Sequence, residues 1–222
     1  MHIGLIGGIG PAATERYYRG LIERSSRSEA PLDLTIVHAD VRQLAANLSA
    51  LARMKQAEVF ARLVQRLAGA GAELAAVSSM GGHFCIRELQ AVSPLPLLNA
   101  IPEIDTAIRQ QGLKNIGILG TRLVMETGLY GGITSARTMA PDEGALELVH
   151  QSYIAMATAG RVTDAQRRIF LVAGEAMVRN GAEAILLGGT DLFLAFEAHD
   201  CSFPVIDSTE IHLDAIYRRL SA

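Results

Sequence analysis

Residues 3–8 read Ile-Gly-Leu-Ile-Gly-Gly, and residues 116–121 read Ile-Gly-Ile-Leu-Gly-Thr. Two further segments recur in the same order. Gly-Ala-Glu stands at 71–73 and 181–183, and Pro-Leu-Leu-Asn at 96–99 is matched by Pro-Val-Ile-Asp at 204–207. The offset is 113 residues for the first pair, 110 for the second and 108 for the third. Because the offset changes by so few residues along the chain, the sequence indicates two copies of one structural unit.

Each copy alternates short apolar runs that end in glycine with longer stretches of helical periodicity, which is typical of parallel β-α units. The pattern predicts an α/β fold of two pseudo-symmetric domains. Each domain is expected to be a mostly parallel sheet flanked by helices, with a ligand cleft between the two. Expected strands are 2–7, 33–39, 74–78, 116–119 and 184–188, and expected helices are 14–29, 52–68, 84–91, 125–137, 145–159, 163–180 and 208–220. We assign residues 1–99 and 205–222 to the first domain and 100–204 to the second.

The composition excludes several classes of protein. Of the 222 residues, half are hydrophobic and 19% are charged, which suffices for one or two domains with cores. A net charge of −3 argues against nucleic acid or an anionic membrane surface as a partner. Two distant cysteines make no disulfide framework, and no Cys/His spacing predicts a metal site. With no signal peptide or membrane-spanning run visible, we expect a cytoplasmic protein.

Small and polar residues follow the strands of both copies. Ser79 comes after the strand expected at 74–78, and Gly189 takes the matching place after 184–188. Ligands of open α/β sheets bind at the carboxyl ends of the strands. We therefore expect these two tips to approach one ligand from opposite faces.

A glycine-rich turn, Gly-Gly-Ile-Gly-Pro at 7–11, stands before the first expected helix. Its backbone N–H groups and the helix dipole could bind a carboxylate. The alternative is a tight turn with no ligand. Ala13 at the third place breaks the dinucleotide fingerprint, and the run lacks the Gly-Lys of a P-loop.

The chain resembles the cofactor-independent aspartate/glutamate racemase family over nearly its whole length. Three segments carry the resemblance: Gly-Leu-Ile-Gly-Gly-Ile-Gly-Pro-Ala-Ala-Thr at 4–14, Leu-Gly-Thr-Arg at 119–122 followed by Met125, Glu126 and Tyr130, and Pro-Val-Ile-Asp-Ser-Thr-Glu-Ile-His at 204–212. The resemblance implies an isomerase that needs no pyridoxal phosphate or other cofactor, binds a small amino acid or carboxylate, and forms a homodimer.

The family's two thiols, one for each face of the substrate Cα, do not carry over. Ser79 stands where the motif Cys-Asn-Thr-x-His has its cysteine, and Gly189 stands at the cysteine of Gly-Cys-Thr-Glu. The residues implied to approach the ligand are Gly8, Gly10, Thr14, Asp40, Arg42, Met80, Gly81, Gly82, Thr121, Gly189 and Thr190. Met80 and Gly81 replace the family's Asn and Thr, and Val124 replaces a threonine, so two or three donors to a substrate carboxylate are lost. Each lost charge-assisted bond weakens binding by about 1.5–3 kcal/mol.

The substitutions change the chemistry that is expected. A thiol with a pKa of about 8.5 can be tuned to working pH, whereas a serine hydroxyl almost never ionises without a partner base. Conventional two-thiol racemisation is therefore not expected. The catalytic candidates are Ser79, His83 and Asp191, where His83 is expected to be neutral and able to activate Ser79 or orient a substrate oxygen. His83 and Asp191 also suit structural roles, as a helix-opening residue and a helix cap.

Three other groups have competing interpretations. Arg42 could pair with a ligand carboxylate or be a solvated surface residue. Cys85 and Cys201 could replace the missing thiols, but neither stands at a strand tip, so buried structural thiols are the favoured interpretation. Two functions remain open: an isomerase or lyase acting at or beside Cα with altered chemistry, and a catalytically inactive family member that binds a small regulatory molecule.

Overall fold

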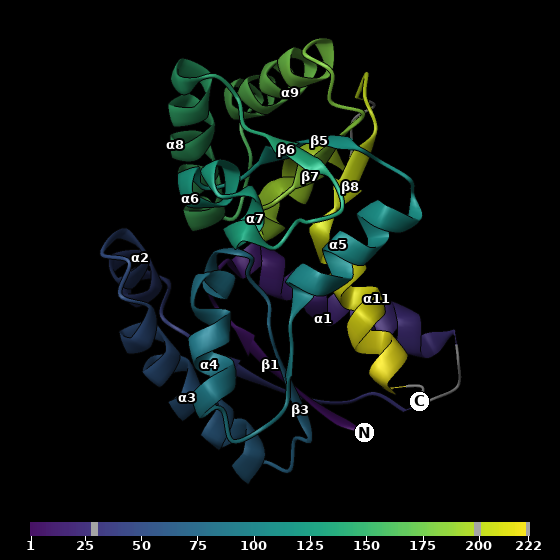
Figure 1. The fold of residues 1–222 in the computed structure, drawn as a ribbon. Helices are drawn as coiled ribbons and strands as arrows, with labels where there is room; N and C mark the ends of the chain where they lie inside the picture. Colours follow the sequence, from purple (N-terminus) through teal and green to yellow (C-terminus); the bar gives the residue numbers. More distant parts are fainter. Residues whose placement is uncertain (28–30, 198–200, 221–222) are drawn as a thin grey trace. The chain divides into compact units, whose positions relative to one another are not determined.

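The structure of the chain, a computed structural model, describes residues 1–27, 31–197 and 201–220 (Figure 1). It contains two four-stranded parallel sheets, ordered β2-β1-β3-β4 and β6-β5-β7-β8. The two sheets have the same topology, because in each the first strand of the unit lies between the second and the third. The predicted α/β class with two similar halves is therefore confirmed, and the ligand cleft expected between them stays a prediction.

The chain divides into two compact units. Residues 1–99 and 212–222 form the first, and residues 100–211 form the second. Residues 205–211, which the sequence pattern assigns to the first domain, lie in the second unit. The reason is strand pairing: β8 (Val205–Asp207) adds to the second sheet beside β7, with Ile206 opposite Leu186.

In the first unit, buried strands lie under helices that are distant in sequence. Helix α1 and the C-terminal part of α11 lie side by side (Figure 1) and share one apolar core with β1, formed by Ile3, Leu5, Tyr17, Leu21, Leu213 and Ile216. Helix α3 contacts β1 and α4. The elements are β1 (His2–Gly7), α1 (Pro11–Ser26), β2 (Asp33–His38), α2 (Val41–Ser49), α3 (Arg53–Gly69), β3 (Leu74–Val77), a 3₁₀ turn η1 (Gly81–Cys85), α4 (Ile86–Val92), β4 (Leu97–Leu98) and α11 (Ser208–Leu220).

The second unit repeats this plan with a different set of helices. Helices α8 and α9 pack against each other (Figure 1), and α9 covers β5 and β7. Asp142 caps α8 through the Ala145 N–H, and Thr163 with Gln166 forms a capping box on α9. The elements are α5 (Ala100–Gln110), β5 (Asn115–Leu119), α6 (Arg122–Glu126), α7 (Gly128–Gly131), β6 (Arg137–Met139), α8 (Glu143–Ala159), α9 (Asp164–Arg179), β7 (Ala184–Leu187), a 3₁₀ turn η2 (Thr190–Leu192), α10 (Phe193–Phe196) and β8.

The helix expected over 125–137 is wrong. The chain leaves the right-handed conformation at Gly128 and stays at positive φ through Leu129, Tyr130 and Gly131, with φ between 56° and 70°. Positive φ is uncommon for residues with a side chain, so Leu129 and Tyr130 are strained. The turn then leads into β6, an edge strand that the sequence pattern did not predict.

Among the described residues, no helix is long and apolar enough to cross a membrane.

Candidate active site

The strand register identifies equivalent positions in the two units. Leu74 of β3 lies opposite Ile3 of β1, and Ala184 of β7 lies opposite Ile116 of β5. Ser79 and Gly189 each follow these register positions by five residues. The structure thus places the two residues at matching tips of the two sheets, as their sequence spacing predicts. We call the segments Ser78–His83 and Gly188–Leu192 the first tip and the second tip.

At the first tip, the Ser79 side chain is held by the 3₁₀ turn that follows. The Gly82 N–H donates to Ser79 Oγ at 3.3 Å, and it also lies 3.1 Å from the Ser79 carbonyl oxygen. Ser79 is 5% exposed. The donated N–H bond would stabilise negative charge that develops on the Ser79 hydroxyl oxygen. Because the hydrogen bond is long, this stabilisation is weak.

His83 does not activate the Ser79 hydroxyl through Nδ1. This nitrogen lies 2.7 Å from the Ser79 backbone carbonyl oxygen, and because a carbonyl only accepts, Nδ1 carries the proton. Burial lowers the pKa of His83 to about 4, so the ring is neutral at neutral pH, as expected. Its observed contact positions the tip backbone, and this matches the structural interpretation of His83.

Two residues without a predicted role extend the contacts of His83: His212 lies beside it, and Tyr17 lies beside His212. The ring of His212, at the end of the third family-like segment, lies edge-on to His83 with centroids 5.7 Å apart. The Tyr17 hydroxyl bonds His212 Nδ1 at 2.7 Å. Burial lowers the pKa of His212 to about 3, and the neighbouring His83 adds to this shift. The first tip therefore rests on a buried chain of neutral polar rings, which only long-range packing brings together.

At the second tip, an aromatic side chain occupies the space beside Gly189. A Cβ built on Gly189 would lie 2.3 Å from Cε2, 2.5 Å from Cζ and 2.7 Å from the hydroxyl oxygen of Tyr153. Tyr153 comes from α8 and is 5% exposed. Sequence reasoning missed it, because the residue lies 36 positions before Gly189 in the sequence and carries no motif.

The second tip also buries a carboxylic acid and a hydroxyl. Asp191 and Thr190 are each 1% exposed. Burial raises the pKa of the Tyr153 hydroxyl well above its ordinary value, and the nearby Asp191 and Tyr130 raise it further. Thr190 Oγ1 is close enough to Tyr153 to offset part of this shift, yet it reaches no hydrogen-bonding geometry within the described residues.

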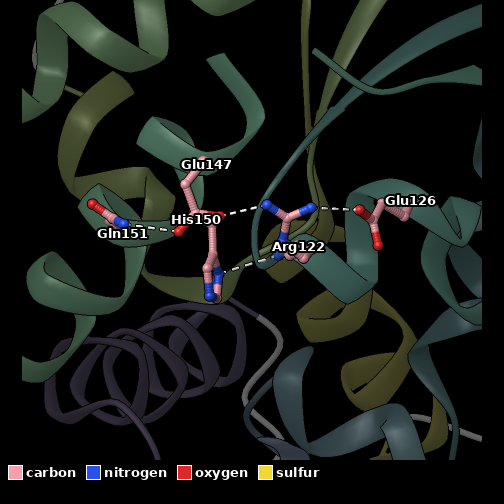
Figure 2. Close-up of polar contacts among 5 residues, drawn as sticks. All are labelled: Arg122, Glu126, Glu147, His150 and Gln151. Atoms are coloured by element: carbon pink, nitrogen blue, oxygen red, sulfur yellow. Dashed lines mark hydrogen bonds and ion pairs between the residues drawn. The ribbon is translucent and has the colours of Figure 1, made fainter. Parts of the chain in front are cut away.

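Thr121 lies at the end of β5 and caps α6, accepting the Val124 N–H at 3.4 Å. The next residue, Arg122, forms hydrogen bonds to α8, the helix that carries Tyr153 (Figure 2). The Arg122 guanidinium bonds Glu126 at 2.7 Å and Glu147 at 2.5 Å, and its backbone N–H donates to His150 Nδ1 at 3.2 Å. The guanidinium is therefore engaged by two carboxylates of the same unit.

The glycine-rich turn is organised by its own hydrogen bonds. The Gly8 N–H donates to Thr14 Oγ1, and the Thr14 hydroxyl donates to the Gly10 carbonyl oxygen, both at 2.9 Å. Gly8 has a φ of +87°, and a Cβ there would lie 2.3 Å from the His38 ring. These bonds use the Gly8 N–H and the Thr14 hydroxyl that an anion would need, and they favour the tight-turn alternative over the carboxylate site.

Arg42 pairs with Asp40. The Asp40 side chain caps α2 through the Arg42 N–H at 2.8 Å and accepts Arg42 Nη2 at 2.9 Å. Hydrogen bonds from Arg42 lower the pKa of Asp40 to about 2. Because the Arg42 side chain is 88% exposed, the structure favours the interpretation of a solvated surface arginine.

The remaining predicted contacts at the first tip are all buried and differ in the room beside them. Met80 is fully buried. A side chain at Gly82 would meet Val77 at 2.9 Å, whereas the nearest atom to a Cβ at Gly81 is Ser79 Oγ at 3.5 Å. Gly81 is therefore the one of these three positions with space beside the serine.

Neither cysteine behaves as a tip thiol. Cys85 is fully buried, contacts the Gly82 carbonyl oxygen at 3.5 Å, and has its pKa raised by burial to about 12. Cys201 contacts the Phe203 carbonyl oxygen at 3.2 Å. Both observations favour structural thiols. Within the described parts of the chain, no group of three or more His, Cys, Asp or Glu side chains is arranged to hold a metal ion.

Comparisons with known proteins agree with the resemblance that the sequence motifs carry. The family model for Asp/Glu/hydantoin racemase matches residues 6–216. An Asp/Glu racemase candidate from Yersinia pestis is 27% identical, with a TM-score of 0.85 and 100% of both chains covered. An aspartate racemase homologue from Pyrococcus horikoshii OT3 is 23% identical, with a TM-score of 0.79 and coverage of 100% and 99%.

A more distant likeness shows the fold alone. The glutamate racemase of Francisella tularensis, solved with D-glutamate, is 12% identical, with a TM-score of 0.68. That alignment covers 99% of this chain and 81% of the other. Because the family model spans nearly all of the sequence, the chain belongs to the Asp/Glu/hydantoin racemase family.

Proposed function

We propose that the protein acts on an amino acid or a related small carboxylic acid, at or next to Cα, by a one-sided proton transfer rather than by two-thiol racemisation. The observation that carries the proposal is that the two matching tips hold a serine and a glycine where the family motifs have thiols. An isomerase or a lyase with a single acid–base group fits this arrangement.

Asp191 is the proposed base. Its carboxylate is buried at the second tip beside Thr190, whose hydroxyl lacks a geometric partner among the described residues and is placed to bind a substrate oxygen. Ser79 is the proposed hydrogen-bonding group of the first tip, and His83 holds its backbone. A serine hydroxyl does not ionise without a partner base, and His83 Nδ1 is already bonded to the Ser79 carbonyl oxygen, which supports giving the proton-abstracting role to Asp191.

Solvent-exchange measurements test the proposal. The protein is incubated in D₂O with L- and D-amino acids and with α-substituted malonates, and loss of the Cα–H signal and release of CO₂ are followed by NMR. We expect deuterium incorporation without appearance of the opposite enantiomer, or decarboxylation. If no compound shows exchange at Cα, inversion or CO₂ release, the proposed enzymatic activity is contradicted.

Matched variants identify the groups involved. Cys85→Ala combined with Cys201→Ser should keep the activity, because neither thiol lies at a tip. Asp191→Asn should abolish it while the fold, checked by circular dichroism, persists. Formation of the opposite enantiomer that disappears in the cysteine-free protein would instead show thiol chemistry and overturn the proposal.

A catalytically inactive binding protein is the second candidate. It is favoured by the internal bonds at the first unit, where the Gly8 N–H, the Thr14 hydroxyl and His83 Nδ1 are all used by the protein itself. A thermal shift with a carboxylate, combined with no exchange at Cα, would support it.

We also propose a homodimer that needs no cofactor. Light scattering tests the dimer, and activity after dialysis against EDTA tests the need for a metal.

A further inference from the structure

We infer that Tyr153 takes the place of the missing second thiol: its ring excludes any side chain at residue 189, and its hydroxyl is the polar group there. The effect on turnover rests on the proposed function, whereas the exclusion does not. The inference concerns one unit only, because Tyr153 and Gly189 both belong to residues 100–211.

The ring, and not the backbone, requires glycine at 189. Gly189 has φ −131° and ψ 128°, an extended conformation that any residue adopts. By contrast, three Tyr153 atoms, Cε2, Cζ and the hydroxyl oxygen, lie within 2.7 Å of a Cβ placed there. Real Cβ atoms do not approach other atoms so closely, so the tyrosine would have to move to admit even an alanine.

Tyr153 has little freedom to move. It lies on the buried face of α8 together with Val149 and Met156, both fully buried. Helix α8 contacts η2 and α6, and Arg122 links α6 to Glu147 one and a half turns before Tyr153 (Figure 2). An aromatic ring anchored in this way fills its volume persistently.

A phenol changes what the tip can do. A cysteine can supply a thiolate near neutral pH, whereas a buried phenol stays protonated and donates a hydrogen bond. With Thr190, whose buried Oγ1 reaches no partner among the described residues, the tip offers two hydroxyls beside one carboxylic acid. Hydroxyl donors suit a carboxylate or enolate oxygen of the ligand, so Tyr153 would hold that oxygen while Asp191 moves the proton.

Thermal unfolding of paired variants tests the exclusion without any ligand. Gly189→Ala is made in the natural protein, in Tyr153→Phe and in Tyr153→Leu. Leucine lacks all three clashing atoms, whereas phenylalanine keeps the two ring carbons. We expect Gly189→Ala to lower Tm by roughly 5 °C with tyrosine or phenylalanine at 153, and by no more than about 1–2 °C with leucine.

Gly144→Ala is the control, since the nearest atom to its Cβ would be Asp142 Oδ1 at 3.8 Å, and it should not lower Tm. Equal tolerance of Gly189→Ala with tyrosine and with leucine at 153 would overturn the exclusion. If the Tyr153→Leu protein does not fold, the natural and phenylalanine backgrounds still decide, because Gly189→Ala without loss of Tm in either one contradicts the inference.

The hydroxyl is tested by absorbance and by exchange. The phenolate absorbance of the natural protein minus that of Tyr153→Phe should stay flat up to pH 10; a phenolate below pH 10 would overturn the donor role. If the protein exchanges the Cα hydrogen of a carboxylate ligand, Tyr153→Phe should slow this exchange at least about tenfold. The exchange rate of Tyr18→Phe, a substitution at an exposed tyrosine, should be unchanged. Equal rates would also overturn the donor role, whereas no exchange by the natural protein contradicts the proposed function alone.

Discussion

The first and second tips occupy the same place in two matching sheets, yet they differ in what occupies the position where the family motifs have a thiol. Ser79 keeps a small polar side chain, and η1 and His83 hold it through hydrogen bonds to Oγ and to the carbonyl oxygen. Gly189 has no side chain, and a residue from another helix fills the space. The comparison shows that equivalent positions of two matching sheets can have different surroundings.

The helix after the second strand of each unit explains the asymmetry. In the first unit this helix is α2, which ends at Ser49 after nine residues and contacts η1. In the second unit it is α8, which has 17 residues and contacts η2. The longer helix carries Tyr153 on its fourth turn, and this places the phenol ring beside Gly189.

Acid should destabilise the protein through two buried histidines of the first unit. His83 and His212 are buried as neutral rings with pKa values of about 4 and 3, below the usual value of about 6.5. The unfolded chain therefore binds more protons between pH 6.5 and pH 4, and stability falls as pH falls through that window. We expect a loss of about 3 kcal/mol from His83 alone.

Urea unfolding at pH 7 and pH 5 measures the part of this loss that falls between the two pH values, about 2 kcal/mol from His83. His83→Asn, whose amide nitrogen can stand in for Nδ1–H, should show a weaker pH dependence than the natural protein. An identical pH dependence of the two proteins would mean that His83 is not held neutral by burial.

Exchanging the two tip residues tests the comparison directly. Gly189→Ser should destabilise the protein by about 1–3 kcal/mol, because the new side chain meets the Tyr153 ring. Ser79→Gly loses one long hydrogen bond and should cost at most about 1 kcal/mol. Chemical denaturation of both variants measures the difference, and equal losses would remove the asymmetry between the tips.

Thr190 should matter for binding and little for stability. Its Oγ1 lacks a geometric partner within the described chain, so the isosteric Thr190→Val should change stability by no more than about 0.5 kcal/mol. Affinity for a carboxylate ligand should fall about tenfold if the hydroxyl binds it. Thr209→Val, which removes a 3.4 Å bond to the Thr190 carbonyl oxygen, is the control for a structural effect.

Arg42 should have the smallest effect. Its exposed guanidinium pairs with Asp40 at the start of α2, so Arg42→Ala should leave ligand affinity unchanged. Isothermal titration of the natural and variant proteins with the same carboxylate checks this. A tenfold loss of affinity would restore Arg42 as the residue that binds a substrate carboxylate.

Much of the scaffold follows from local patterns. Apolar runs that end in glycine or serine predicted the central strands β1, β3, β5 and β7, because such runs are buried on both faces. The short edge strands β4 and β6 escaped prediction, since they have few residues and little periodicity. The break at 128–131 also escaped, because the pattern of hydrophobic residues there continues through a turn of positive φ.

The sequence by itself determined the duplication, the family, and the loss of both thiols at Ser79 and Gly189, because these are properties of residue identity and spacing. Only the tertiary structure decided what surrounds them. Tyr153 lies beside Gly189, His212 beside His83 and Tyr17 beside His212, across separations of 36, 129 and 195 residues. Such contacts depend on how helices pack against the sheets, and no local pattern of residues encodes that packing.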